Sequence, residues 1–282
     1  MKTFNGKAIY NPSGKAGEYA EWACNFYTGC SNNCSYCYLK KGVLSHMWST
    51  TPQLKKCFKD ENHALEIFEK ELRANLPELQ KHGLLFSFTT DPMLEKTKWL
   101  TINAIKRCFW NNVHCTILTK CAFSTFGMWF PNKERFMSVE DLFSENKNLI
   151  SFGFTLTGHD ELELNASTNA ERIEAMRKLH DFGFKTWASI EPVIDIQSSF
   201  NMIFATAGFC DLYKVGLMSG GKYTKNELLW LIEECRKIAN VYKEYNFIPK
   251  FYFNDSLLKQ AGISRENLPA NCVGRDYDMF NN

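Results

Sequence analysis

Short, buried-type strands alternate with helical patterns along most of this chain. The expected strands are 20–29, 84–90, 113–119, 149–157, 184–191, 211–217 and 248–254, and most are separated by a segment with apolar residues at helical spacing. This rhythm favours a parallel sheet, and six or seven such units suit a β/α barrel better than an open doubly wound sheet. The sequence therefore predicts an α/β fold, a partial (β/α)6-type TIM barrel.

One domain accounts for the whole sequence. No repeat, low-complexity segment or linker interrupts the 282 residues, a length that a single barrel can fill. We expect the barrel core over residues 20–254, a short N-terminal extension over 1–19 and a short C-terminal extension over 255–282.

Capping residues mark the ends of the expected helices. Asn62 and Gly83 bracket a first helical segment with its apolar residues on one face. A second helix is expected over 98–110, before the strand 113–119. Two later helices begin with a capping box, Thr168 with Glu171 and Thr224 with Glu227.

Composition limits the classes of protein that this chain can be. Eleven cysteines are an odd number and most are scattered, which fits free thiols plus a metal site better than a secreted disulfide scaffold. The net charge of +2 gives no global argument for nucleic acid, although nucleic acid as a partner stays open. We see neither a signal peptide nor an apolar run of membrane-spanning length. The expectation is a cytoplasmic protein without a membrane partner.

Three of the cysteines form a cluster in the sequence. Residues 27–42 read YTGCSNNCSYCYLKKG and place Cys30, Cys34 and Cys37 at spacings of four and three. A structural zinc site needs four ligands, and the one candidate for the fourth is Cys24, where a core thiol is the simpler interpretation. An iron–sulfur cluster on three thiolates would instead leave one iron open to a small molecule. Zinc and iron–sulfur both remain open from spacing alone.

A C-x3-C-x2-C motif after the first barrel strand, with the aromatic Tyr36 before its last cysteine, resembles the radical S-adenosylmethionine (SAM) enzymes. That resemblance implies a [4Fe–4S] cluster on Cys30, Cys34 and Cys37, with SAM on the open iron. It also implies a reductant such as a flavodoxin or ferredoxin, and a 5′-deoxyadenosyl radical that abstracts hydrogen from a substrate. The alternatives are a redox-only cluster, or a non-catalytic zinc or iron–sulfur module that docks nucleic acid or a protein partner.

The resemblance extends to one branch of that superfamily, the spore-photoproduct-lyase-like proteins, often labelled DNA repair photolyase. The stretches that carry it are AIYNPSGKAGEYA, NFYTGCSNNCSYCYL, FSFTTDPM, ILTK, FGFTLT, TWASIEPVID and YKVG, in this order between residues 8 and 216. The branch typically has a Glu-Pro pair before the helix that follows the fourth strand. Here that stretch reads LNASTNAER, although Arg172 still matches the arginine after the pair.

Polar residues follow the ends of the predicted strands, where the sites of barrel enzymes lie. By resemblance, Thr89, Thr90 and Asp91 would hold the amino group of SAM, and Lys120 its carboxylate. Turn chemistry at Asp-Pro and a solvated lysine are the plain alternatives. The remaining candidates for the SAM pocket are Thr155 and Thr157 near the ribose, Arg172, and Glu191, whose alternative role is a salt bridge at the barrel rim.

The thymine-dimer chemistry of the spore lyases is not expected here. In those enzymes a cysteine before Thr-Ser-Asp returns a hydrogen to the product, and Phe88 stands in its place in this sequence. Cys121, just past the third strand, is the nearest substitute donor. The aromatic insertion 123–137 could be a lid that stacks on a base, or a flap over the barrel. We predict SAM cleavage without thymine-dimer reversal, on a substrate that the sequence does not identify.

Overall fold

The computed structural model describes residues 3–122, 128–130 and 135–281. The chain divides into two compact units, the first comprising Met1–Ser151 and Glu161–Ser167 and the second comprising Phe152–Asp160 and Thr168–Asn282. The first boundary falls within strand β9 (Ile150–Thr155). The other two boundaries lie on either side of Glu161–Ser167, a short stretch of the loop after β9 that belongs to the first unit. The single domain over 1–282 stays a prediction.

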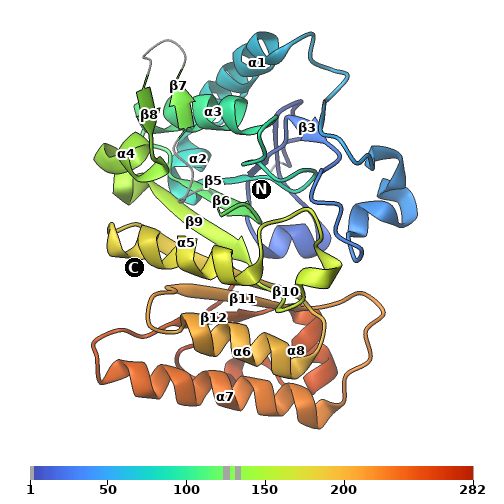
Figure 1. Cartoon of the computed structure of the whole chain (residues 1–282), viewed down its shortest axis with the longest axis vertical. Helices are drawn as coiled ribbons and strands as arrows, with labels where there is room; N and C mark the ends of the chain where they lie inside the picture. Colours follow the sequence, from blue (N-terminus) through green and yellow to red (C-terminus); the bar gives the residue numbers. More distant parts are fainter. Residues whose placement is uncertain (1–2, 123–127, 131–134, 282) are drawn as a thin grey trace. The chain divides into compact units, whose positions relative to one another are not determined.

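The first unit combines short strands with helices (Figure 1). Its elements are β1 (Ile9–Tyr10), β2 (Ala23–Cys24), β3 (Tyr27–Thr28), β4 (Gln53–Leu54), α1 (Glu61–Ala74), α2 (Leu76–His82), β5 (Leu84–Phe86), α3 (Lys98–Trp110), β6 (Cys115–Thr119), β7 (Met128–Phe130), β8 (Arg135–Met137) and α4 (Val139–Phe143). The sheet order is β1-β2-β5-β6. β1 and β2 are antiparallel, whereas β2 with β5 and β5 with β6 are parallel. The predicted parallel pairing is therefore present in this unit.

The strand predicted over 20–29 is wrong in its extent. Only β2 joins the main sheet, while β3 pairs with β4 in a separate two-stranded sheet. The break lies at the buried Asn25, whose side chain accepts a hydrogen bond from Phe88 N (2.8 Å) and donates one to the Tyr10 hydroxyl (2.7 Å). A long apolar and aromatic run does not reveal such a break, because the side chain that causes it bonds to residues far away in the sequence.

The helix predicted between Asn62 and Gly83 is two helices. Pro77 lies at the start of α2, where its missing N–H costs nothing, but it cannot continue α1. The N-cap of α1 is Asp60, which accepts a hydrogen bond from His63 N (2.8 Å), so the prediction of Asn62 as the cap is wrong. Gly83 ends α2 with φ 69°, as the stop signal predicted.

The second unit contains β9 from Phe152 onward, α5 (Asn169–Asp181), β10 (Lys185–Val193), α6 (Ile196–Thr206), β11 (Leu212–Leu217), α7 (Lys225–Lys243), β12 (Lys250–Phe253) and α8 (Asp255–Ala261). β10 with β11 and β11 with β12 are parallel. Figure 1 shows α6, α7 and α8 on one side of β11 and β12, with α7 outermost. The capping boxes predicted at the starts of α5 and α7 are both confirmed.

Aromatic and aliphatic side chains are packed inside each unit. In the first unit, the Phe68 ring lies 5.6 Å from the Phe26 ring and 6.3 Å from the Phe86 ring. In the second, Tyr213 and Phe251 stack at 4.8 Å. The buried face of α7 repeats at intervals of three and four residues, and consists of Leu228, Leu231, Ile232, Cys235, Ile238 and Ala239.

These elements confirm the α/β class, and their order of strands and helices is consistent with the predicted partial barrel. The aromatic insertion contains the antiparallel pair β7 and β8, while its residues 123–127 and 131–134 lie outside the described residues. Its role as a lid or flap stays a prediction. Among the described helices, none is both long enough and apolar enough to cross a bilayer.

Candidate functional site

The three clustered cysteines lie on one loop that begins after β3. Gly29, with φ 78°, precedes it, and a Cβ there would lie 2.9 Å from the carbonyl oxygen of Ser49. Only glycine permits this close approach at positive φ. Cys30 N donates to the same Ser49 oxygen (2.9 Å), and Cys37 N donates to the carbonyl of Cys34 (3.2 Å). The first of these bonds fixes the start of the loop to Ser49, and the second closes a turn between Cys34 and Cys37.

Cys34 is buried and Cys30 is half-buried, and burial is the main influence on the pKa of both thiols. Burial, and then the nearby Asp91 carboxylate, raises the pKa of Cys30 to about 12, against hydrogen bonds from the backbone of Asn32 and Asp91. Burial also raises the pKa of Cys34, an effect that the Lys120 ammonium opposes. Both thiols are therefore neutral at neutral pH in the metal-free protein. A metal that binds them must displace their protons, and the N–H groups that face Cys30 suit the resulting thiolate.

Two polar atoms beside the cysteine loop are buried without a hydrogen-bond partner in the described part of the chain, Asn32 Oδ1 and Thr90 Oγ1. Buried polar atoms are normally paired, so these two unpaired atoms mark where a polar ligand would find hydrogen-bond partners. Among the described residues, no three or more His, Cys, Asp or Glu side chains converge on a single ion. The thiolates of a [4Fe–4S] cluster each bind a different iron and need not converge in this way. The three thiols of the loop are chemically suited to such a cluster.

Asp91 links the cysteine loop to the end of β6. Its Oδ2 accepts hydrogen bonds from Asn32 Nδ2 (2.9 Å) and Lys120 N (2.7 Å), and its Oδ1 accepts them from Thr119 Oγ1 (2.6 Å) and Met93 N (3.0 Å). The residue is 7% exposed. Through these four hydrogen bonds the Asp91 carboxylate connects the cysteine loop to the end of β6. Its contact with SAM stays a prediction.

The residues before Asp91 lie close to the cysteine loop as well. The Thr89 hydroxyl donates to the carbonyl of Tyr27 (2.5 Å), and the Tyr38 hydroxyl donates to the carbonyl of Phe88. The Tyr19 ring meets the Phe88 ring edge-on at 6.2 Å. The position expected for a thiol hydrogen donor is thus occupied by an aromatic ring that packs on another ring. Cys121, the substitute donor, is half-buried, with its N–H donating to Thr119 Oγ1 (3.0 Å).

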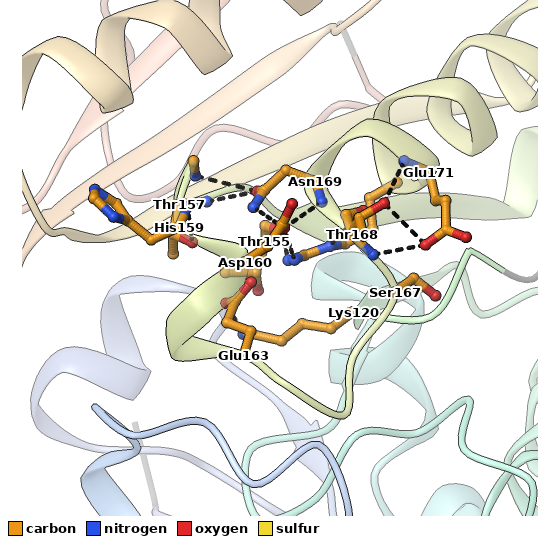
Figure 2. A network of polar contacts seen from close by, with 12 residues as sticks. Lys120, Thr155, Thr157, His159, Asp160, Glu163, Ser167, Thr168, Asn169 and Glu171 are labelled. Carbon is orange, nitrogen blue, oxygen red and sulfur yellow. Dashed lines mark hydrogen bonds and ion pairs between the residues drawn. The ribbon is translucent and has the colours of Figure 1, made fainter.

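Glu163 is a site residue that the sequence analysis missed. Its side chain is fully buried (0% exposed) and lies 3.7 Å from the Lys120 ammonium. It also accepts a hydrogen bond from the Tyr36 hydroxyl, and Lys120 Nζ lies 5.6 Å from the centre of the Tyr36 ring. Figure 2 shows the Lys120 side chain extended toward Glu163. The signal was present, because Glu163 directly precedes the stretch LNASTNAER, where the related branch has its Glu-Pro pair.

In the second unit, Thr155, Thr157 and Arg172 come together around the start of α5. The Arg172 guanidinium is fully buried and donates to the carbonyl of Thr155, while its Nη2 lies 3.7 Å from Asp160 Oδ1. Asn169 Oδ1 accepts a hydrogen bond from Thr157 N (3.0 Å), as the dashed lines in Figure 2 show. These contacts join the end of β9 to α5, and a role in binding SAM stays a prediction for all three residues.

Glu191 lies on β10 beside Gly216 of β11. A Cβ on Gly216 would lie 2.4 Å from Glu191 Cδ and 2.4 Å from Asn254 Nδ2, so both side chains pass over the backbone at this glycine. Asn254 caps α8 through its Oδ1, which accepts from Leu257 N (2.9 Å). Its Nδ2 is buried without a partner in the described residues. The sequence pointed to Glu191 but not to Asn254, which reads as an ordinary N-cap.

A hydrogen bond joins the loop after β9 to the residue that caps α6 in the second unit. His159 Nε2 lies 2.6 Å from Asp195 Oδ2, and Asp195 also caps α6 by accepting from Ser198 N (2.8 Å). Burial raises the pKa of Asp195, but the hydrogen bonds from Ser198 and His159 outweigh burial and lower that pKa overall. The carboxylate is therefore charged down to more acidic pH than an ordinary aspartate.

Solved structures provide the comparison that bears on this geometry. No protein-family model matches the chain, and no curated protein matches it. A tyrosine-to-phenylalanine variant of spore photoproduct lyase matches with a TM-score of 0.56 and 14% identity, over 86% of this chain and 78% of the other. At the level of the fold, the chain is similar to spore photoproduct lyase. The predicted resemblance is confirmed to that extent.

Two further structures of the same lyase support this likeness. A double variant described as having bound AdoMet and dinucleoside spore photoproduct matches with a TM-score of 0.53 and 16% identity, over 76% of this chain. A cysteine-to-alanine variant matches with a TM-score of 0.55 and 16% identity, over 79% of this chain. The chain spans only 61% and 62% of these two proteins' lengths.

Proposed function

We propose that this protein is a radical SAM enzyme, with a [4Fe–4S] cluster on Cys30, Cys34 and Cys37. The observation that carries the proposal is a C-x3-C-x2-C loop after β3 in a chain with the fold of spore photoproduct lyase. When bound, the cluster and SAM supply reductive cleavage to a 5′-deoxyadenosyl radical, which abstracts hydrogen from the substrate. A flavodoxin or ferredoxin would supply the electron.

The residues around the loop suit the binding of SAM. The Lys120 ammonium retains hydrogen-bond donors beyond its 3.7 Å ion pair with Glu163, and could hold a carboxylate. The unpaired atoms Asn32 Oδ1 and Thr90 Oγ1 would accept hydrogen bonds from the amino group of SAM. Burial of Cys34 and of this pair of atoms excludes water from the same region, as radical chemistry requires.

The substrate is proposed to differ from that of the spore lyases. A returning hydrogen needs a weak bond such as a thiol S–H, and the matching position holds the Phe88 ring. Cys121 is the substitute donor to test. Incubation of the reconstituted enzyme with dinucleoside spore photoproduct should consume SAM without catalytic formation of two intact thymines. Catalytic return of both thymines would overturn this part of the proposal.

One experiment tests the class of enzyme. After anaerobic reconstitution, we expect iron and acid-labile sulfide near four each per chain, and 5′-deoxyadenosine after addition of SAM and reductant. Alanine at Cys30, Cys34 or Cys37 should remove most of the iron, whereas Cys24→Ala, a matched change of a core thiol, should keep it. Stoichiometric zinc after both aerobic and anaerobic purification, without deoxyadenosine, would favour the non-catalytic module.

A further inference from the structure

The stretch Glu161–Ser167 belongs to the first unit, although the residues on both sides of it belong to the second. We call it the clasp. Its backbone and side chains bond to the cysteine loop at two points: Ser35 N donates to Leu162 O (2.9 Å), and Asn165 Nδ2 donates to Ser31 O (3.1 Å). The clasp therefore contacts the loop on both sides of Cys34.

The clasp also bonds to the chain just past β6. Ser167 N donates to Lys120 O (3.2 Å), and Ala122 N donates to Ser167 Oγ (3.0 Å). The cysteine loop and the end of β6 are far apart in sequence, and the clasp bridges them. These four hydrogen bonds hold the seven residues of the clasp in place, and with them the side chain of Glu163.

Glu163 is the charged centre of the clasp. A carboxylate that is 0% exposed needs compensation, which Lys120 at 3.7 Å and the Tyr36 hydroxyl supply. Tyr36 lies directly before Cys37 and two residues after Cys34. A contact that fixes Tyr36 therefore also affects the distance between Cys34 and Cys37, two of the proposed cluster ligands.

We propose that Glu163 is a positioning residue for the metal site, one that clamps Tyr36 and Lys120 against the cysteine loop and adds a buried negative charge beside it. The inference rests on the proposed function. Groups that orient metal ligands through a hydrogen bond typically change metal affinity by about 10- to 100-fold when they are removed. A buried charge also acts on the reduction potential of a cluster, because reduction adds a further negative charge.

The two roles of Glu163 can be separated by substitution. Glu163→Gln keeps an oxygen that accepts from Tyr36 but removes the charge, whereas Glu163→Leu removes both. Glu161→Gln is the matched control, because it makes the same change of charge in the clasp at an exposed side chain. After anaerobic reconstitution, each variant is measured for iron per chain, for the rate of iron loss to a chelator, and for the midpoint potential of the cluster by spectroscopically monitored titration.

Glu163→Leu should lose iron about 10- to 100-fold faster than the wild type. Glu163→Gln should keep nearly full iron but shift the midpoint potential to more positive values, and Glu161→Gln should match the wild type in both. If Glu163→Leu does not fold, the Gln variant decides the question through its potential. Glu163 variants that match Glu161→Gln in both iron loss and potential would overturn the inference. A wild-type protein that binds zinc and no cluster would refute the proposed function, and the same variants' zinc-loss rates would then test the clamp.

Discussion

The Asp91 carboxylate provides the sharpest test of the region around the cysteine loop. It accepts four hydrogen bonds at 2.6 to 3.0 Å while 7% exposed, and two of the donors are side chains, Asn32 Nδ2 and Thr119 Oγ1. Asp91→Ala leaves these donors and the Lys120 N–H without an acceptor. Each buried donor left unpaired costs about 1–3 kcal/mol.

The donors belong to one network, so their losses do not simply add, and water entering the space left by the carboxylate recovers part of the cost. We expect Asp91→Ala to lower the free energy of unfolding by about 4 kcal/mol. Asp91→Asn keeps one accepting oxygen but turns an N–H₂ group toward two donors, and should cost about 2 kcal/mol. Glu95→Gln is the control, because that side chain is 86% exposed and its loss should stay within about 0.5 kcal/mol.

Urea denaturation followed by tryptophan fluorescence measures these differences, with iron content after reconstitution as the second readout. Because Asn32 lies between Cys30 and Cys34, Asp91→Ala should lower iron content as well as stability. An Ala variant within about 1 kcal/mol of the wild type would refute the network argument. If that variant also kept its iron but bound SAM weakly, Asp91 would be a contact of SAM alone.

Three further changes test the second unit by the same unfolding assay. Gly216→Ala places a Cβ 2.4 Å from Glu191 and should cost about 1–3 kcal/mol through overpacking; unchanged stability would mean that those side chains move aside freely. Arg172→Met leaves the buried Thr155 carbonyl without its guanidinium donor, while Asp160 is 49% exposed, and should cost about 1–3 kcal/mol; a loss below about 0.5 kcal/mol would leave cofactor binding as its main role. Asp195→Ala should cost about 1 kcal/mol at pH 7 through the lost N-cap. Because the pKa of Asp195 is lowered in the folded state, this difference is present above the unfolded pKa and should shrink as pH falls below about 4; a difference independent of pH would contradict it.

Local signals predicted those parts of the fold that depend on local chemistry. The capping boxes at Thr168 and Thr224 place helix starts correctly, because the two residues that form each box lie within one turn of each other. The strand predicted over 20–29 failed because Asn25 bonds to Phe88, sixty-three residues away. No periodicity in the sequence encodes such a partner.

The residues of the candidate site also differ in how far the sequence alone could single them out. The cysteines stood out in the sequence because their spacing and their chemistry coincide in eight residues, and their role as metal ligands stays a prediction. Glu163 was missed although it directly precedes the stretch LNASTNAER, because it lies in a loop without periodicity and its burial against Tyr36 and Lys120 is visible only in the structure. Asp91 was predicted for its position after a strand, yet its four hydrogen bonds within the protein are visible only in the structure.

Cys24 bears on the choice between a closed metal site and an open one. It is fully buried on β2 and pairs in register with Phe86 of β5. Burial, and then the neighbouring thiol of Cys108, raises its pKa far above the ordinary value, so the thiol is protonated and packs as a small apolar group. The nearest candidate in sequence for a fourth ligand is therefore committed to the core of the first unit. With Cys24 in the core, the three thiols of the loop match the donor set of the proposed cluster, in which one iron is left for a small molecule.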